Sequence, residues 1–239
     1  MNVLIVHAHP EPQSFTTAMK DVAVESLTAR GHAVEVSDLY AMKFEPVASA
    51  ADFSRRKNPN YLVYALEQRQ AYESESLPAD IAAELAKVMR ADLIILSFPM
   101  FWFSVPAMLK GWIDRVLISG VCYGGKRFYD RGGLRGKKML ASFTLGGPEH
   151  MFGPEAIHGE IAAMLRPLLR GTFYYVGCAV LPPFVAWHVP YVTNDVRNAY
   201  LEDYREYLST IETVPPLEFP SLDNFDERFR PRKMMPLGK

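Results

Sequence analysis

The residues best suited to chemistry form one loop, Phe98-Pro99-Met100-Phe101-Trp102-Phe103, between an apolar run and a helical pattern. The preceding run, Leu93-Ile94-Ile95-Leu96, is typical of a strand buried on both faces of a parallel sheet. Open α/β sheets bind ligands at the carboxyl ends of their strands. Three aromatic side chains and a methionine at such an end favour a flat aromatic ligand. The alternative is that Phe101, Trp102 and Phe103 are ordinary core residues.

A second candidate site follows the first expected strand. Ser14 has the side chain of an N-cap for the helix that comes next. The free N–H groups in the first turn of a helix favour an anion, most often phosphate, so Ser14 to Thr17 form a candidate phosphate site. Simple capping by the hydroxyls is the alternative. The loop is neither a GxGxxG dinucleotide loop nor a Walker A loop, which gives nucleotide hydrolysis no support.

Two glycines and three histidines are further candidates for a functional site. Gly146 and Gly147 follow an expected strand, and adjacent glycines let the backbone approach a ligand closely or adopt positive φ. His158 precedes an apolar helical pattern. His7 and His9 flank the end of the first strand, but no further ligands stand nearby, so we expect no metal site.

The elements that must position these residues alternate between strand and helix. The patterns predict strands at Asn2–Val6, Ala33–Leu39, Leu93–Leu96, Lys137–Thr144 and Thr172–Leu181, and helices at Phe15–Thr28, Asp80–Met89, Ala107–Val116, Ile161–Leu169 and Asn198–Ile211. The first three elements form a βαβ unit, which is right-handed by strong precedent. The alternation predicts the α/β class, with a doubly wound parallel five-stranded sheet in the order 2-1-3-4-5 and a ligand at the carboxyl ends of strands one, three and four.

Two segments fit no regular pattern. Residues 40–78 form an irregular insertion after the second strand, and a connection this long is usually functional or part of an interface. Its basic triplet, Arg55-Arg56-Lys57, is most simply a solvated face. The end of the chain contains five prolines from Pro215 onward. We therefore predict a domain over residues 1–213 and an extended tail over residues 214–239, with both segments at the interface of a homodimer.

The composition excludes several classes of protein. Apolar residues make up 49% of the chain and charged residues 22%, as in soluble globular proteins. The net charge of −1 gives no electrostatic reason to bind nucleic acid or an anionic membrane. Cys122 and Cys178 form neither a metal-ligand pattern nor a disulfide framework. With no signal-peptide pattern and no apolar run of roughly 20 residues, we expect a cytoplasmic protein.

Several motifs taken together resemble the NAD(P)H:quinone oxidoreductase (DT-diaphorase) family. They are HAHPEPQSF-TTAMK, SDLYAM-F-P, FP-x-x-WF-VPA-LKGW-x-x-RV and T-x-GG…M…IHG, and their spacing agrees from Val3 to about Leu217. Each motif is weak alone, but the combination is highly specific. The resemblance implies a flavodoxin-like fold, a bound flavin, a homodimer, and two-electron reduction of quinones in a ping-pong cycle with NADH or NADPH.

The resemblance also implies which residues bind the flavin. They are His9, Ser14, Phe15, Thr16, Ala18, Pro99, Met100, Phe101, Trp102, Phe103, Thr144, Leu145, Gly146, Gly147, Arg197 and Leu201. The first five would hold the phosphates. Residues 99–103 would contact the isoalloxazine, with backbone amides on its polar edge, and residues 144–147 would lie under the dimethylbenzene and pyrimidine region. Arg197 and Leu201 match positions that meet the adenosine diphosphate half of FAD, which favours FAD over FMN.

A substrate pocket is implied as well, with His158 as the catalytic residue. Its members would be Trp102, Phe103, Tyr123, Phe152 and His158. Where the animal enzymes have a tyrosine that completes a proton relay, this chain has Phe152. Another pocket tyrosine is replaced by Gly125, and the glutamine of the aromatic loop by Phe101. We therefore expect His158 alone to become imidazolium and stabilise the anionic edge of reduced flavin. The alternative is a structural histidine that caps the following helix.

Two other functions remain as alternatives. Similar proteins serve as ancillary subunits of bacterial potassium-efflux antiporters, so a regulatory flavoprotein in peripheral contact with a membrane protein is the second hypothesis. A flavodoxin-type electron carrier is the third. Such carriers are usually small and strongly acidic, which a chain of 239 residues with a net charge of −1 is not.

Overall fold

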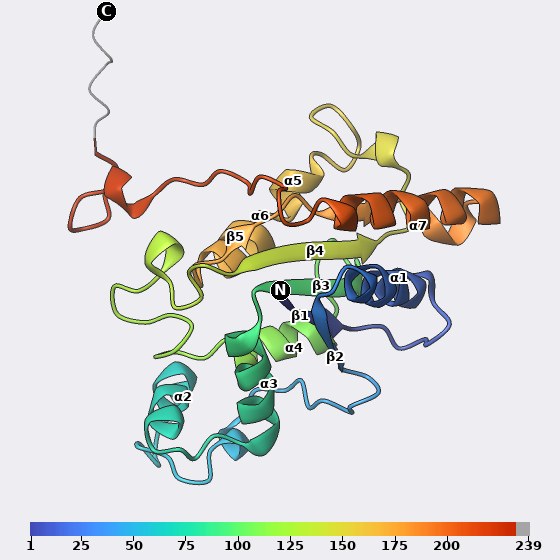
Figure 1. Cartoon of the computed structure of the whole chain (residues 1–239). Helices are drawn as coiled ribbons and strands as arrows, with labels where there is room; N and C mark the ends of the chain where they lie inside the picture. The colour runs from blue at the N-terminus through green and yellow to red at the C-terminus, as the bar shows by residue number, and fades with distance from the viewer. Residues whose placement is uncertain (233–239) are drawn as a thin grey trace, which may run out of the picture.

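The computed structural model describes residues 1–232, and a parallel sheet forms its centre (Figure 1). The strands are β1 (Asn2–His7), β2 (Ala33–Asp38), β3 (Leu93–Pro99), β4 (Lys138–Thr144), β5 (Ala179–Val180) and β6 (Phe184–Ala186). They pair in parallel in the order β2-β1-β3-β4-β5, and β6 pairs with β4 beyond the end of β5. The predicted class and strand order are confirmed, with one short strand added. Because all strands run the same way, β1, β3, β4 and β6 end at one edge of the sheet.

Seven α-helices lie within residues 1–232. They are α1 (Phe15–Ala29), α2 (Tyr64–Glu73), α3 (Ala79–Arg90), α4 (Ala107–Val116), α5 (Ile161–Met164), α6 (Arg166–Leu168) and α7 (Asn194–Ser209). Helices α1 and α7 pack together on one face of the sheet, and α3 and α4 pack on the other (Figure 1). Helix α7 begins at Asn194 rather than at the predicted Asn198, because the Thr193 side chain caps it through the amide of Val196 (3.4 Å).

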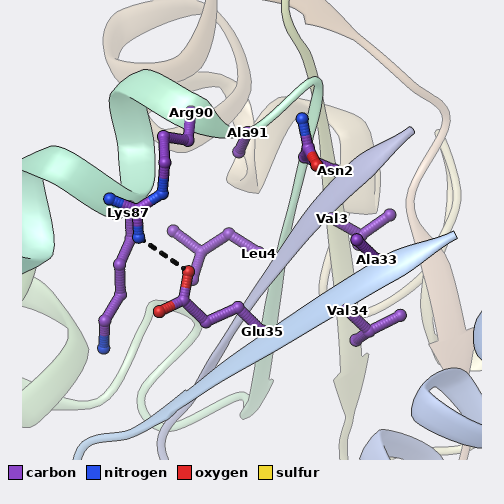
Figure 2. Close-up of a pocket in the computed structure, with 9 residues that line it drawn as sticks. All are labelled: Asn2, Val3, Leu4, Ala33, Val34, Glu35, Lys87, Arg90 and Ala91. Atoms are coloured by element: carbon purple, nitrogen blue, oxygen red, sulfur yellow. Dashed lines mark hydrogen bonds and ion pairs between the residues drawn. The ribbon is translucent and has the colours of Figure 1, made fainter.

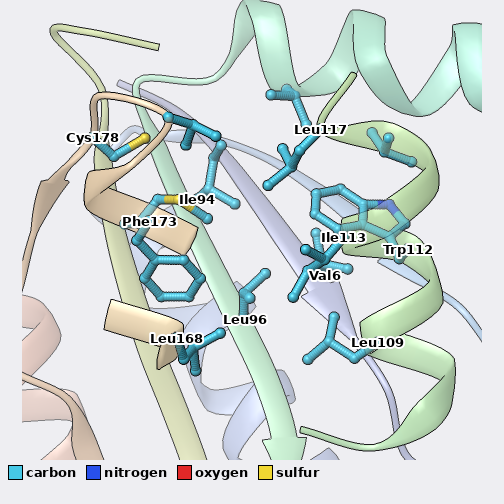
Figure 3. Packing of buried hydrophobic residues seen from close by; sticks show 14 of the residues in the cluster. Val6, Ile94, Leu96, Leu109, Trp112, Ile113, Leu117, Leu168, Phe173 and Cys178 are labelled. Atoms are coloured by element: carbon cyan, nitrogen blue, oxygen red, sulfur yellow. The ribbon is translucent and has the colours of Figure 1, made fainter. Parts of the chain in front are cut away.

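Alternate residues of the central strands serve two hydrophobic cores. Val6, Ile94 and Leu96 are fully buried and face Leu109 and Trp112 of α4 (Figure 3). Their neighbours along the same strands join the second core, beneath α1 and α7. This coverage of both faces explains why the strand at residue 93 appears in the sequence as a continuous apolar run.

Helix α2 corrects the prediction that residues 40–78 are irregular. The helix buries polar side chains: Glu67 is 3% exposed and Gln68 is 2% exposed. Glu67 accepts hydrogen bonds from two backbone amides of the preceding loop (2.7 and 3.1 Å), and Gln68 donates one to a backbone carbonyl of α4 (3.0 Å). Apolar periodicity is the main sequence signal of a helix, so a helix with a polar buried side escapes it.

A buried ion pair fastens this insertion to α4. Arg115 Nη2 lies 2.8 Å from Asp52 Oδ1, and the two side chains are 4% and 7% exposed. Arg115 Nη1 also pairs with Asp80 Oδ2 (2.8 Å) and donates to the Glu45 carbonyl (2.6 Å). The Tyr64 hydroxyl donates to Asp52 Oδ2 (2.5 Å). The insertion is thus held by charged and polar contacts as well as by apolar packing.

The chain between α5 and β6 departs most from the sequence patterns. In place of one helix over residues 161–169 there are α5, α6 and a π-helical segment, Leu169–Tyr174. The strand predicted at residues 172–181 is wrong, since only its Ala179–Val180 part joins the sheet. Its aromatic residues have strong β propensity, but the rings of Tyr174 and Tyr175 pack against the ring of Tyr129 instead, with ring centroids 5.4 Å apart in both pairs. Tertiary contacts override propensity here.

The expected extended tail begins with ordered contacts. The Leu217 amide donates to the Val180 carbonyl (2.7 Å), and Phe219 packs on Tyr174 (4.9 Å). Farther along, the tail extends away from the sheet (Figure 1). The predicted tail also includes residues 233–239, which lie outside the described residues. Within residues 1–232, no helix is both long enough and apolar enough to span a bilayer.

Candidate functional site

A pocket of about 270 Å³ lies at the carboxyl ends of β1, β3 and β4. Its lining residues are His9, Ser14, Phe15, Thr16, Pro99, Met100, Phe101, Thr144, Leu145, Gly146, Val189 and Pro190. The structure therefore brings together ten of the residues to which sequence analysis gave a cofactor-binding role. Val189 and Pro190 were missed, because the last strand was placed too early for them to fall at its carboxyl end.

A larger cavity, of about 360 Å³, lies near the opposite end of β1 and β2, against α3 (Figure 2). Its charged side chains are already paired. Arg90 Nη2 lies 3.1 Å from Glu35 Oε2, and Lys87 Nζ lies 2.7 Å from Glu84 Oε1. This arrangement is less suited to an anion than the pocket at the carboxyl ends.

The start of α1 supplies hydrogen-bond donors to the pocket. Ser14 caps the helix by accepting a hydrogen bond from the amide of Thr17 (3.1 Å), so the amides of Phe15 and Thr16 remain outside the helical bonding pattern. The hydroxyls of Thr16 and Thr144 lie 2.8 Å apart and join this turn to β4. Ala18, in contrast, does not line the pocket, and its amide bonds to the Ser14 carbonyl (3.0 Å).

His9 adds a further donor beside this turn. The Glu11 amide points at His9 Nδ1 (3.0 Å), so in the neutral imidazole this nitrogen accepts and Nε2 carries the proton. The Glu11 carbonyl also lies 3.1 Å from Nδ1, but a nitrogen that accepts the amide proton cannot also donate. Burial lowers the pKa of His9, which favours this neutral form.

The aromatic loop forms a tight turn from Phe101 to Ser104. Their backbones exchange two hydrogen bonds of 3.0 Å, while Trp102 and Phe103 adopt φ values of 50° and 57°. Such left-handed conformations cost about 1–3 kcal/mol each in residues other than glycine and cluster at functional sites. Trp102 is 95% exposed, which excludes the core alternative for that side chain. Met100 and Phe101 already use their amides, so only those of Trp102 and Phe103 remain for a ligand.

Four rings form a row beside the pocket. The ring centroids of Phe103 and His158 are 5.3 Å apart, those of His158 and Phe152 5.0 Å, and those of Phe152 and Trp187 5.2 Å. Trp187 was not recognised in the sequence. A Cβ at Gly147 would stand 3.0 Å from the Phe152 ring, so this position suits glycine. His158 is the one titratable member of the row.

The strand-to-helix turn after β6 supports the glycine loop. The His188 amide donates to the Gly147 carbonyl (3.1 Å), and His188 Nδ1 lies 2.6 Å from the Gly146 carbonyl, a contact in which the ring nitrogen donates. The backbone of His188 is left-handed, with φ of 54°. These bonds use the carbonyls of the loop and leave the amides of Gly146 and Gly147 for a ligand.

Nine residues predicted to belong to the site are not among those that line the pocket: Ala18, Trp102, Phe103, Tyr123, Gly147, Phe152, His158, Arg197 and Leu201. Three of them have contacts elsewhere. Arg197 donates from Nε and Nη2 to the Val189 carbonyl (3.2 and 3.0 Å), so it stabilises the backbone of a residue that lines the pocket. Leu201 packs in the core beneath α7. Tyr123 packs on Tyr175 (5.6 Å) and lines a separate cavity.

The donor set fits a flavin nucleotide. Amides at the start of α1 and His9 Nε2 suit phosphate, the amides of the glycine loop suit a polar ring edge, and the apolar walls suit a flat ring. A metal ion is less well served: residues 1–232 contain no group of three or more His, Cys, Asp or Glu side chains that could hold one.

Comparison with known proteins relates the chain to dehydrogenases that act on quinones. A family model described as a flavodoxin-like fold matches residues 1–208. Ribosyldihydronicotinamide dehydrogenase [quinone] of Mus musculus is 42% identical over 216 residues, which cover 90% of this chain and 94% of that protein. NAD(P)H dehydrogenase [quinone] 1 of Cavia porcellus is 41% identical over 228 residues, or 95% and 83% of the two chains.

Two further matches come from Klebsiella pneumoniae. The crystal structure of a protein described as a putative quinone reductase superimposes with a TM-score of 0.92 at 33% identity, covering 97% of this chain and 94% of that one. The glutathione-regulated potassium-efflux system ancillary protein KefF is 33% identical over 207 residues, or 86% of this chain and 94% of that protein.

Proposed function

This chain belongs to the flavodoxin-like family that includes the NAD(P)H dehydrogenases [quinone], and on that premise we propose that it reduces quinones by two electrons with NADH or NADPH through a bound flavin. The observation that carries the proposal is the pocket at the carboxyl edge of the sheet. Amides at the start of α1 and in the glycine loop that could bind a ligand lie at this pocket, and the row of aromatic rings lies beside it, in a chain that is 42% identical to a quinone dehydrogenase.

The phosphate end of the flavin would lie at the start of α1. His9, Ser14 and the amides of Phe15 and Thr16 are the donors there, and Ala18 contributes through the helix rather than by direct contact. The ring would lie between the loop from Pro99 to Phe103 and the loop from Thr144 to Gly147. The flavin supplies the hydride chemistry when it is bound.

The substrate would stack on the aromatic side of the site. Phe103, Phe152 and Trp187 offer flat apolar surfaces to a quinone ring. His158 can hold a proton on its imidazole and so place a positive charge between two of these rings. Since Phe152 has no hydroxyl, no proton passes through that position, and His158 carries this role alone.

The active unit would be a homodimer. The insertion exposes several large apolar side chains, of which Tyr61 is 68% exposed and Leu66 is 51% exposed. Tyr123, a predicted substrate-pocket residue, lies away from the pocket of its own chain, so it would have to act in the site of a second copy. Light scattering at micromolar concentration tests this, and a stable monomer would contradict it.

FAD is the proposed cofactor, with FMN as the alternative. In the resemblance to the quinone oxidoreductases, Arg197 and Leu201 match positions that meet the adenosine diphosphate half of FAD, although neither residue lines the pocket. A cytoplasmic location is proposed because both cysteines, Cys122 and Cys178, are buried and unpaired.

The decisive experiment is to release the cofactor from purified protein and to record its absorption spectrum and mass. We expect a flavin spectrum, and the mass separates FAD from FMN. Anaerobic NADH or NADPH should then bleach the bound flavin, and a quinone should restore its colour. Protein that binds no flavin, or flavin that neither nucleotide reduces, would refute the proposal.

A second candidate is a regulatory subunit of a membrane transporter. The identity of 33% to KefF, described as an ancillary protein of a potassium-efflux system, favours it. Co-purification with a membrane antiporter, together with slow NAD(P)H turnover by the isolated protein, would support this function over the enzyme.

A further inference from the structure

His7 is a buried titratable residue with no part in the proposed chemistry. It ends β1 at the carboxyl edge of the sheet and is 1% exposed. Its Nδ1 lies 3.1 Å from the hydroxyl of Ser97, the residue opposite it on β3, and its Nε2 lies 3.2 Å from the hydroxyl of Thr17 on α1. The imidazole therefore bridges the sheet and the first turn of the helix.

The chain of hydrogen bonds continues to the pocket. Thr17 Oγ1 lies 2.9 Å from Ser14 Oγ, and the same Ser14 oxygen accepts from the Thr17 amide (3.1 Å). Ser14 caps α1 and lines the pocket. An unbroken path thus runs from β3 through His7 and Thr17 to the cap of the candidate phosphate site.

The protonation state of His7 determines which of its ring nitrogens donates and which accepts. Burial lowers the pKa of His7 to about 4, and the nearby charges of Asp38, Lys20, His9 and Asp21 act in both directions with smaller effect. At neutral pH the imidazole is therefore uncharged, with one nitrogen that donates and one that accepts. The Thr17 hydroxyl also donates to the Glu11 carbonyl (3.3 Å), so it can accept from Nε2–H while the Ser97 hydroxyl donates to Nδ1.

Other hydrogen bonds at this end of α1 are local or lead to β4. The loop between β1 and α1 contains Pro10 and Pro12, which lack an N–H, and its Ser14 amide bonds locally to the Glu11 carbonyl (3.1 Å). Thr16 ties the turn to β4 through Thr144 (2.8 Å). Consecutive threonines thus connect the first turn of α1 to different strands, and His7 provides the link to β1 and β3.

We infer that His7 is a positioning residue for the flavin phosphate: it orients the Ser14 cap and the first-turn amides of α1 without touching the ligand. This inference rests on the proposed flavin function. It predicts that losing the bridge weakens binding of flavins that carry a phosphate and leaves binding of riboflavin, which has none, nearly unchanged.

The test measures dissociation constants of FAD, FMN and riboflavin for the apoprotein by quenching of flavin fluorescence. His7→Phe removes both hydrogen bonds and keeps a ring in the space. We expect its dissociation constants for FAD and FMN to rise about 5- to 30-fold and that for riboflavin to change less than about 2-fold. Thr17→Val cuts the same path one link later and should give the same pattern, which keeps the test available if His7→Phe folds poorly.

Two further variants distinguish a specific positioning role of His7 from a non-specific disruption of the structure. His7→Gln places an amide near Nε2 and keeps the link to Thr17, so it should retain most of the preference for phosphorylated flavins, whereas His7→Asn should lose it. The double variant His7→Phe/Thr17→Val should be no worse than His7→Phe alone, because both changes interrupt one path. As a control, His188→Ala releases the Gly146 carbonyl at the ring end and should weaken all three flavins alike.

Each outcome is decisive. If His7→Phe weakens riboflavin and FMN equally, or changes neither, the positioning role is overturned while the proposed function stands. If the wild-type protein binds none of the three flavins, the proposed function fails and this inference fails with it. Selective loss of the phosphorylated flavins, recovered in His7→Gln, supports the role of His7.

Discussion

Removing Arg115 should destabilise the protein far more than removing an exposed cation from the same helix. Arg115 is 4% exposed and holds Asp52, 7% exposed, by two hydrogen bonds of 2.8 and 3.3 Å. Breaking a buried pair by deleting one partner costs about 3–5 kcal/mol, because the remaining charge stays buried. The free energy of unfolding of Arg115→Met should fall by that amount in urea titrations at pH 7.

Helix α4 contains its own control. Lys110 pairs with Asp114 at 2.7 Å, but the two side chains are 59% and 43% exposed. Exposed pairs contribute about 0–1 kcal/mol, so Lys110→Met should have little effect. Pairing Arg115→Met with Asp52→Leu should recover part of the loss, since no unpaired carboxylate then remains at residue 52.

The effect of pH gives a second check on the same pair. Burial alone would raise the pKa of Asp52, but hydrogen bonds from Arg115 and Tyr64 outweigh it, and the pKa lies below its ordinary value. The stabilisation from this carboxylate is therefore present above its ordinary pKa and is lost as the pH falls through the lowered one. The difference in the free energy of unfolding between wild type and Arg115→Met should therefore become smaller at acidic pH. If Arg115→Met loses no more stability than Lys110→Met, the buried pair does not anchor the insertion.

Three other predictions follow from the site and the core. His158→Ala should leave flavin bound but slow its reduction by NAD(P)H about 30- to 1000-fold in stopped-flow experiments, because it removes one charge-assisted contact worth about 2–4 kcal/mol in the transition state. Phe152→Tyr should leave that rate similar or raise it. If His158→Ala is reduced at the wild-type rate, the histidine is structural. His7 has a pKa of about 4 in the folded protein and 6.5 in the unfolded chain, so its contribution to the free energy of unfolding is complete above pH 6.5 and is lost as the pH falls toward 4. Over this range the free energy of unfolding should fall by about 3 kcal/mol. His7→Phe should remove that part of the pH dependence. A Cβ at Gly111 would stand 2.1 Å from the Pro46 carbonyl oxygen, so Gly111→Ala should lower the melting temperature even though alanine favours helices, and a stabilised variant would contradict this packing.

The sequence predicted the sheet and most of the pocket because their signals are local. Apolar runs locate β1, β3 and β4, and Ser14 marks the start of α1, while the resemblance to the quinone oxidoreductase family implied a cofactor-binding role for ten pocket residues. The apolar pattern does not reveal α2, where the buried face is polar. It also misplaced the last strand, since the aromatic residues near Tyr174 pack on a distant loop rather than in the sheet.

Long-range contacts account for the functional residues that were missed. Trp187 joins the aromatic row through Phe152, and His188 contacts the glycine loop, yet neither residue type carries a motif in this region. Placing β6 at Phe184–Ala186 would have put both residues just past a strand end. Pro182 and Pro183, which directly precede β6, hide this strand in the sequence pattern, because proline usually stands outside a ladder.

The interruption between β5 and β6 has a consequence for solubility. A sheet edge with a continuous row of free amides and carbonyls is a template for pairing with other chains and for aggregation. On this edge Pro182 and Pro183 present no N–H, and the Pro182 carbonyl accepts from the Tyr207 hydroxyl (2.7 Å). The Leu217 amide covers the Val180 carbonyl (2.7 Å). The proline step and the start of the tail thus shield the open side of the sheet against adding a strand from a neighbouring molecule.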